Sequence, residues 1–353
     1  MHNNRRARCR RAFRLLPESQ LYFSLEGRIC PNSHKFVTSR CYPEGVISTE
    51  HQILRARPNT PGLPATSAGR TAGADTGGSL PVDTFSKGPI LDESLPDLSG
   101  FANFSRSRLL AVRDSKDTSP DPRVLFVDKK DGAITPVNMD WSKTGTARDL
   151  EAVTPNANGG GGFLAVEGSS FGEKKARLFE LSVGQRNGTA DKSHILPDFG
   201  QEIEGMTALK GENGNQTVLF AGRGGNGQQG RIYWGELGAN GLSFSKEGLN
   251  GQAVHAPQIG EGQRDLAELT VDKQGKMWGA AATDNGDDGP FTSALYQVGQ
   301  LTPGGATPFQ VSQGGPSVLL NDIKAEAVSA QGNGKFFIGS DNESFGGRID
   351  TLG

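Results

Sequence analysis

A hairpin-shaped segment recurs five times along this chain, and this repeat constrains the fold more than any other feature. In residues 148–170 a short apolar run begins at Leu150, a glycine-rich turn follows, and a second run ends at Glu167. Segments of the same shape occupy residues 96–116, 202–225, 264–289 and 323–344. Short apolar runs on both sides of a Gly/Asn-rich turn predict antiparallel β-hairpins.

Each hairpin has one residue near the start of its first strand that we call the mouth position. The mouth positions are Ser99, Glu151, Glu204, Glu268 and Glu326, which lie 52, 53, 64 and 58 residues apart. A supersecondary unit that repeats at this period is typical of a propeller or a solenoid. In the fourth copy a gapless alignment places Ala267 at the mouth, so only a local bulge would bring Glu268 into line with the others.

Further strands are predicted after the hairpins. Third strands are expected at residues 123–128, 176–183, 231–237, 293–301 and 348–352, and fourth strands at 134–141, 193–199, 242–247 and 306–312. Four antiparallel strands make a propeller blade. The 50 glycines among 353 residues, about twice the usual share, suit many tight turns. We therefore predict an all-β fold, a single β-propeller of five four-stranded blades. A degenerate sixth blade, in the longer intervals after Glu204 and Glu268, is the alternative.

The last repeat supplies only three strands before the chain ends. An extended segment at residues 82–93 has no other partner in the pattern. Because an unpaired edge strand is a liability, we expect part of this segment to close the propeller. It would form the outermost strand of the last blade, antiparallel to residues 348–352.

Residues 1–80 differ in composition from the propeller, which we place at residues 81–353. They hold 12 lysines and arginines against 5 acids, whereas the remainder holds 25 against 34. Residues 58–80 are too rich in Pro, Gly, Ala and Thr to build a core. We predict a disordered basic extension and linker. Binding of nucleic acid or an anionic surface by this arm is one interpretation, and an extension that results from a misplaced start codon is another. We expect no nucleic-acid binding by the propeller itself.

Several functional classes find no support in the residues. No apolar stretch has the length of a membrane span or the form of a signal peptide, and neither the compartment nor the oligomeric state can be assigned. Cys9, Cys30 and Cys41 all precede the propeller, which argues against a zinc or thiol site there. The segments GSSFG (168–172) and GRGGNG (222–227) resemble catalytic or nucleotide-binding motifs but lead into strands, so we interpret both as loops.

The loops that leave the second strand of each hairpin are rich in Asp, Asn, Ser and Gly. In an antiparallel hairpin these loops emerge at the same edge as the mouth position, so Glu151 and Glu167 are expected to face a common space. A solvated strand edge is the simpler alternative. Hard oxygen ligands of this kind suit calcium or magnesium. The candidate ligands, expected around a central channel, are Glu151, Glu167, Glu204, Asp284, Glu326 and Asp341. Arg223 interrupts the acids and is expected to pair with Glu204 or to hold a phosphate or carboxylate group.

The motifs DLEA with AVEGSS, IEGM, and KAEA followed by GSDNE resemble the phytase-like propeller family described as "esterase-like activity of phytase". They are also similar to a neighbouring group of uncharacterised bacterial propellers. The resemblance covers roughly residues 91–353. It implies a propeller related to calcium-dependent phytases, with acidic residues on the channel face. The chain departs from a complete carboxylate ring at Ser99, Arg223 and Ala267.

Two functions of different classes follow. The first is a calcium-dependent hydrolase of phosphoesters or esters, in which Glu151 and Glu326 take part in catalysis and Arg223 holds the anion. The second is a non-catalytic propeller that binds a small anionic ligand or a protein on the same face. A fold does not decide a function, so the sequence leaves open whether the protein is an enzyme.

Overall fold

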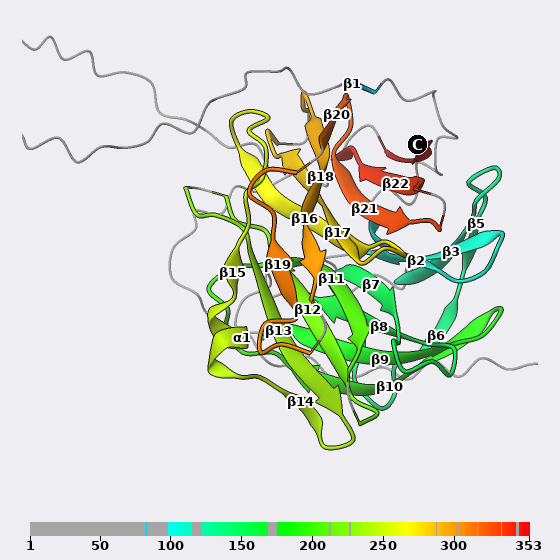
Figure 1. Cartoon of the computed structure of the whole chain (residues 1–353). Coiled ribbons are helices and arrows are strands. Elements are labelled where there is room, and N and C mark those ends of the chain that lie inside the picture. Colours follow the sequence, from blue (N-terminus) through cyan, green and yellow to red (C-terminus); the bar gives the residue numbers. More distant parts are fainter. Residues whose placement is uncertain are drawn as a thin grey trace, which may run out of the picture. The chain divides into compact units, whose positions relative to one another are not determined.

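The computed structural model describes residues 98–114, 122–168 and 175–353, without residues 212, 226, 287, 303, 316, 333, 344 and 345, together with the backbone of residues 82–83. The predicted basic extension and linker, residues 1–80, lie outside the described residues. From Leu98 onward the described chain forms five sheets arranged as a β-propeller (Figure 1). The prediction of five blades is therefore confirmed.

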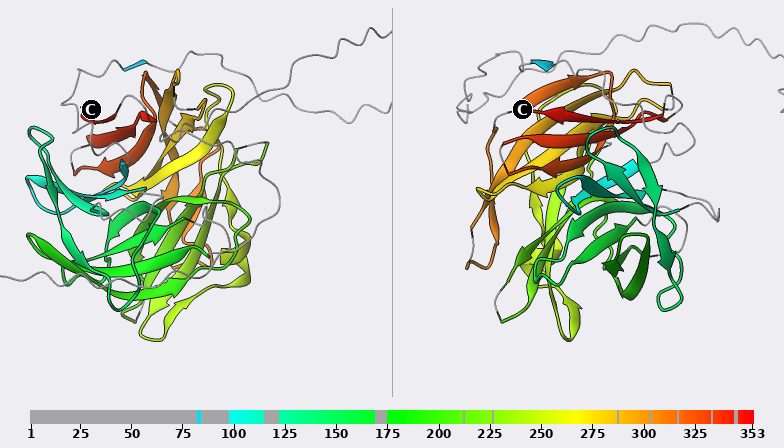
Figure 2. Two further views of the ribbon diagram at one scale, coloured as in Figure 1. Left: turned by 180° about the vertical axis from the view of Figure 1, so that it is seen from behind. Right: turned by 90° about the vertical axis from the view of Figure 1, so that its right-hand side faces the viewer.

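The first strand of each hairpin lies at the centre of the ring. These inner strands are β2 (Leu98–Asn103), β7 (Leu150–Pro155), β11 (Ile203–Lys210), β16 (Gln263–Val271) and β21 (Ala325–Ala330). Each contacts the next, and β21 contacts β2, so the ring of inner strands is closed (Figures 1 and 2).

The second and third strands follow in antiparallel order outward from the centre. The second strands are β3 (Arg108–Arg113), β8 (Gly162–Glu167), β12 (Gln216–Gly222), β17 (Lys276–Thr283) and β22 (Phe336–Asp341). The third strands are β4 (Val124–Asp128), β9 (Arg177–Val183), β13 (Arg231–Gly238), β18 (Thr292–Leu301) and β23 (Gly347–Leu352). All of these strands lie where the repeat predicts them.

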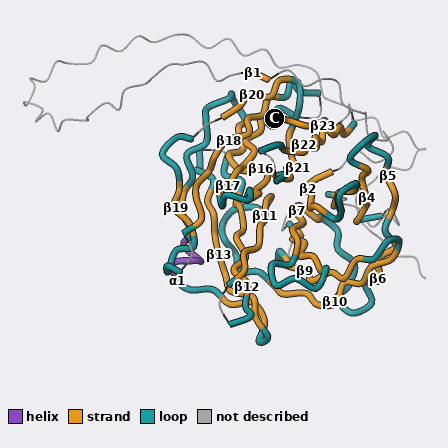
Figure 3. The backbone as a smooth tube through the Cα atoms, turned by 45° about the vertical axis from the view of Figure 1, so that its right-hand side comes forward, coloured by secondary structure: helices purple, strands orange, loops and turns teal. Residues whose placement is uncertain are grey.

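The outer strands are less regular than the prediction (Figure 3). The first sheet ends with β5 (Ile134–Pro136) and the second with β10 (Asn187–Ile195), against which β6 (Asn138–Asp140) pairs in parallel. In the third sheet the outer edge is divided between β14 (Gly241–Ser243) and β15 (Gln252–Ala253), on either side of α1 (Lys246–Asn250). In the fourth it is divided between β19 (Phe309–Val311) and β20 (Ser317–Asn321).

The predicted closure on the last blade is wrong for the described part of the closing segment. β1 (Val82–Asp83) pairs in parallel with β20 of the fourth sheet, with Val82 opposite Leu319 and Asp83 opposite Leu320. The prediction failed because no pattern in the sequence indicated that the fourth sheet would end in β20, whose outer edge pairs with β1. Residues 84–93 of the segment lie outside the described residues, and the described part of the fifth sheet contains β21, β22 and β23.

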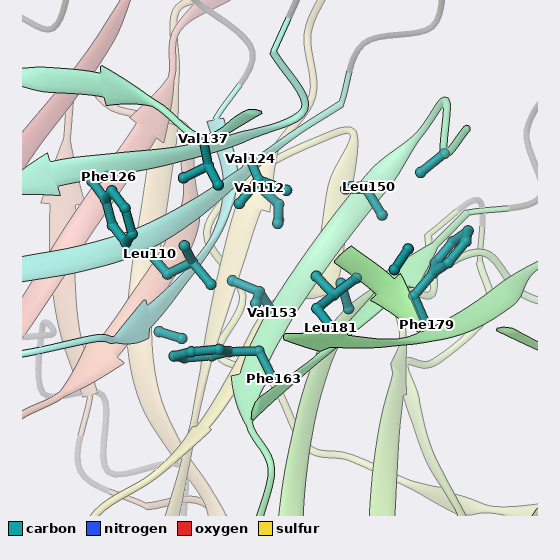
Figure 4. Close-up of a cluster of buried hydrophobic side chains, with 14 residues drawn as sticks. Leu110, Val112, Val124, Phe126, Val137, Leu150, Val153, Phe163, Phe179 and Leu181 are labelled. Atoms are coloured by element: carbon teal, nitrogen blue, oxygen red, sulfur yellow. The ribbon is translucent and has the colours of Figure 1, made fainter. Parts of the chain in front are cut away.

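The hydrophobic core is divided among the interfaces between neighbouring sheets. Figure 4 shows the cluster between the first two sheets, where Leu110 and Phe126 pack with Val153 and Phe163. Similar clusters join each later pair of sheets, including the fifth and the first. Both faces of the inner strands are therefore buried, which explains why they read as continuous apolar runs. This packing fixes the strand ends that carry the polar residues.

Candidate functional site

A β-bulge in the inner strands sets the direction of the mouth residues. In β2, β7, β11 and β21 the register against the second strand shifts at the mouth position, which is Ser99, Glu151, Glu204 and Glu326 in turn. A bulge leaves the extra residue outside the ladder and re-aims its side chain. The irregularity in β16 is longer and extends from Arg264 to Glu268.

Glu151, Glu204 and Glu326 come together where the inner strands begin, a region that we call the mouth, and each is 8% exposed. Burial raises the pKa of Glu151 well above its ordinary value, and the carboxylates of Glu204, Asp114 and Asp149 add to this effect. Burial also raises the pKa values of Glu204 and Glu326. Like charges held close in a poorly solvated place resist ionisation. The structure thus brings these three predicted residues into one electrostatic group.

The tightest carboxylate group joins Glu151 to two residues outside the predicted ligand set. Asp114, Asp149 and Glu151 each place one oxygen within 4.8 Å of the others, and we call them the acidic trio. Asp114 and Asp149 form an isolated β-bridge between the first and second blades. The amide of Asp114 also donates a hydrogen bond to Ser99 Oγ at 3.0 Å. The trio therefore depends on the contact between two blades.

Gly168 makes room for the acidic trio. A Cβ atom added at Gly168 would lie 2.9 Å from Glu151 Oε1 and 3.0 Å from Asp149 Oδ2. Its amide donates to the Asp149 carbonyl oxygen, which holds the backbone in this place. Any side chain at this position would push the two carboxylates apart.

Glu167 belongs to a different interaction. Its Oε2 accepts a hydrogen bond from Arg177 Nε at 2.5 Å, and its Oε1 accepts from the Arg148 amide at 2.7 Å. The register explains this placement, because Glu167 lies opposite Leu150, as Arg113 lies opposite Leu98. Gly168, and not Glu167, is the counterpart of Asp114. Successive side chains of a strand point to opposite sides, so this one-residue difference directs Glu167 away from the trio.

Three cations occupy the mouth on the side of the later blades. Arg223 Nη1 lies 2.6 Å from Glu202 and 3.2 Å from Glu204, which agrees with the expected pairing of Arg223 and Glu204. Arg264 lies 2.5 Å from Asp284 and 3.6 Å from Glu326.

Lys324 completes this group with an ion pair to Glu326 at 3.0 Å and another to Glu343. Burial by itself would lower the pKa values of Arg264 and Lys324, but the surrounding carboxylates outweigh it and raise both. We call Arg223, Arg264 and Lys324 the basic group.

The remaining predicted ligands, Asp284 and Asp341, lie beside the basic group. Burial acts to raise the pKa of Asp284, yet Arg264 and Lys324 lower it overall. Burial, followed by Glu326 and Glu343, raises the pKa of Asp341 to about 8. The mouth thus has an acidic side on the first two blades and a mixed, largely paired side on the others.

Sequence reasoning missed four site residues, which are Asp114, Asp149, Arg264 and Lys324. For Arg264 a signal was present, because RDLE and RDLA place Arg148 and Arg264 at equivalent positions beside the mouth. Lys324 precedes the mouth residue Glu326 by the same two residues as Asp149 precedes Glu151. Comparing the residues two before each mouth position would have found both Asp149 and Lys324.

No family model and no curated protein matches the chain. Among solved structures, a putative glycoside hydrolase from Bacteroides ovatus is 11% identical, covering 76% of this chain and 93% of that chain, with a TM-score of 0.45. An α-L-arabinofuranosidase from Podospora anserina is 12% identical over 77% and 97% of the two chains, with a TM-score of 0.42. A putative oxidoreductase (glucose dehydrogenase) from Thermus thermophilus is 9% identical over 74% and 98%, also with a TM-score of 0.42. These likenesses are too weak to carry an argument about activity.

Among the described residues, no helix is long and apolar enough to cross a membrane.

Proposed function

We propose that this propeller is a hydrolase that binds a divalent cation, calcium in the first place, at the acidic trio and acts on a small phosphoester or ester. The observation that carries the proposal is the convergence of Asp114, Asp149 and Glu151 over the bare backbone of Gly168. The phytase-like motifs of the sequence support the same class of reaction.

The trio suits a hard cation in its chemistry and its charge. Carboxylate oxygens are the ligands that calcium and magnesium prefer. Burial is the main cause of the raised pKa of Glu151, and the carboxylates of Glu204, Asp114 and Asp149 add to it. A cation at the trio would offset the part that comes from these neighbouring charges. A bound calcium would polarise a scissile group and make a coordinated water a better nucleophile.

The other mouth residues supply the remaining roles in this proposal. Glu326, whose pKa is raised by burial, would accept a proton from an attacking water. Arg223 is held by Glu202 and Glu204, and its guanidinium would bind a phosphate or carboxylate of the substrate. Glu204, Asp284 and Asp341 lie in the mixed-charge part of the mouth and would orient this group.

Calcium titration by calorimetry tests the metal site directly. Wild-type protein is expected to bind calcium, and Glu151→Gln to lose at least about tenfold in affinity, because one of three charged ligands is replaced. Glu247→Gln, at an exposed position in α1, is the matched control and should bind like the wild type. Equal binding by the Glu151 variant would refute the site.

Turnover of a phosphoester and ester panel tests the reaction. Activity should require calcium and should fall in Glu326→Gln while calcium binding persists. The second candidate is a non-catalytic binding propeller, and one observation favours it. The cations of the basic group already pair with carboxylates of the chain itself, as in a structural network. Calcium binding without turnover on any panel member would support that alternative.

A further inference from the structure

Glu268 is a buried acid that the proposed function does not use. It is 2% exposed, and the acids that raise the pKa values of Glu151, Glu204 and Glu326 do not include it. The bulge in β16 therefore does not bring Glu268 into the mouth group. The carboxyl oxygens of Glu268 must therefore find hydrogen-bond donors outside the mouth.

Glu268 occupies the position at which the other four inner strands have glycine or alanine. A Cβ at Gly100 would lie 2.7 Å from Ala152 Cα and 3.0 Å from Val153 N of the next blade. A Cβ at Gly205 would meet Glu268 Cα at 2.9 Å and Leu269 N at 2.6 Å in the same way. Glu268 is thus the counterpart of Ala152. The corresponding residues of the other blades are Gly100, Gly205 and Ala327, each of which follows its mouth residue.

The Glu268 carboxyl faces backbone amides of four blades. Oε1 accepts a hydrogen bond from the Leu269 amide at 2.8 Å. The amides of Met206, Val328 and Phe101, on β11, β21 and β2, lie near the carboxyl and act to lower its pKa. Only the Leu269 contact has full hydrogen-bond geometry, and Oε2 is buried without a completed hydrogen bond. A single acid therefore lies at a position where the other inner strands have only glycine or alanine.

We propose that Glu268 is a neutral carboxyl that closes the channel beneath the mouth and joins the inner strands of four blades through their amides. A buried carboxylate without a counter-ion is costly. Among the described groups, the charged residues on the mouth side of β7, β11, β16 and β21 are Glu151, Glu204, Arg264, Asp265 and Glu326, while Lys210 and Lys276 lie at the far ends of β11 and β17. Because Glu268 would close the channel beneath the mouth, a substrate or ligand would reach the site from the mouth face alone.

Burial raises the pKa of Glu268 well above its ordinary value, although the amides of Leu269, Met206, Val328 and Phe101 oppose this shift. The contribution of Glu268 to stability is then complete below the pKa of the unfolded chain and is lost as the pH rises through the folded pKa. Glutamine has nearly the same shape as glutamic acid but does not titrate. The difference between wild type and Glu268→Gln therefore isolates the pH dependence that Glu268 causes from that of the mouth acids, which both proteins contain.

Thermal and urea unfolding of wild type and Glu268→Gln between pH 5 and pH 10 test the charge state. We expect the folding equilibrium constant of the wild type to fall, relative to the variant, by up to about tenfold for each pH unit between the pKa of an unfolded glutamate and the folded pKa, and to level off above the folded pKa. A wild type that gains on the variant as pH rises, or a difference that is the same at every pH, would show that Glu268 is ionised and overturn the proposal.

Glu268→Ala tests whether Glu268 joins the inner strands. This variant gives the fourth blade the residue that β7 and β21 have at this position, so the strand itself should still form. Hydrogen exchange at Phe101, Met206 and Val328 is expected to accelerate by at least about tenfold as the shared contact is lost. Unchanged exchange at these three amides would show that Glu268 does not join the blades.

Discussion

At the scale of single residues, the acidic trio depends on a glycine as much as on its three carboxylates. Gly168 has no Cβ, and the carboxylates of Glu151 and Asp149 occupy the space in which one would lie. Its backbone is not in the left-handed region, so an alanine is conformationally acceptable there. A substitution at Gly168 is therefore expected to change the geometry of the trio while the blade still folds.

Gly168→Ala should weaken calcium binding by about tenfold or more, because its methyl group displaces at least one of two ligands, whereas stability should change by no more than about 1–2 kcal/mol. Calorimetric titration and urea unfolding measure the two effects. Wild-type affinity in this variant would mean that the trio is not the cation site.

Asp341 provides a pH dependence that can be tested. Its folded pKa, raised by burial and by Glu326 and Glu343, is about 8, above that of an aspartate in the unfolded chain. The stability that it contributes is thus present at low pH and lost as the pH rises toward 8. Relative to Asp341→Asn, the wild type should lose about 1 kcal/mol per pH unit between pH 5 and 8. Thermal unfolding of both proteins over this range checks the prediction, and a difference that stays the same from pH 5 to pH 8 would show that Asp341 is ionised throughout.

At the scale of the strand and hairpin, register decides which acids meet. The bulge in β7 leaves Glu151 at the mouth, and the pairing of Leu150 with Glu167 directs Glu167 to Arg177. The Arg177 guanidinium also lies over the Phe179 ring, 4.7 Å from its centroid. Glu167 therefore holds β8 against β9 and does not contribute to the trio.

Glu167→Gln should destabilise the protein by about 1–3 kcal/mol, because a buried charged hydrogen bond loses its acceptor charge. Calcium affinity should remain within about twofold of wild type. Chemical denaturation and calorimetry on the same sample distinguish this result from the sequence-based interpretation of Glu167 as a ligand, which requires the affinity to fall.

At the scale of the whole propeller, closure places the fifth blade beside the first. Leu98, Phe101 and Leu109 share a cluster with Ala327 and Ile349, so residues more than 200 apart in sequence form one interface. The same closure brings Glu326 close enough to affect Glu151. β1 adds a short pairing to the fourth sheet.

Truncation tests the contribution of β1. Deletion of residues 1–78 should leave the melting temperature unchanged, since that composition cannot build a core. Deletion of residues 1–83 removes the pairing with β20 and should lower the melting temperature by a few degrees. Equal melting temperatures for the two truncated proteins would show that β1 contributes nothing measurable.

The sequence by itself determined the repeat, and through it the five blades, the order of the strands and the position of Glu151, Glu204 and Glu326 near the centre. These features follow from local patterns of apolar residues and turns, which each hairpin carries within about 25 residues. Only the tertiary structure decided which charged groups meet. Side chains alternate between opposite sides along a strand, so the bulge in β7 brings Gly168, and not Glu167, to the trio. The separate irregularity in β16 keeps Glu268 out of the mouth group. Asp114 meets Asp149, and Arg264 meets Glu326, only because neighbouring blades pack together, and no spacing along the chain encodes that contact.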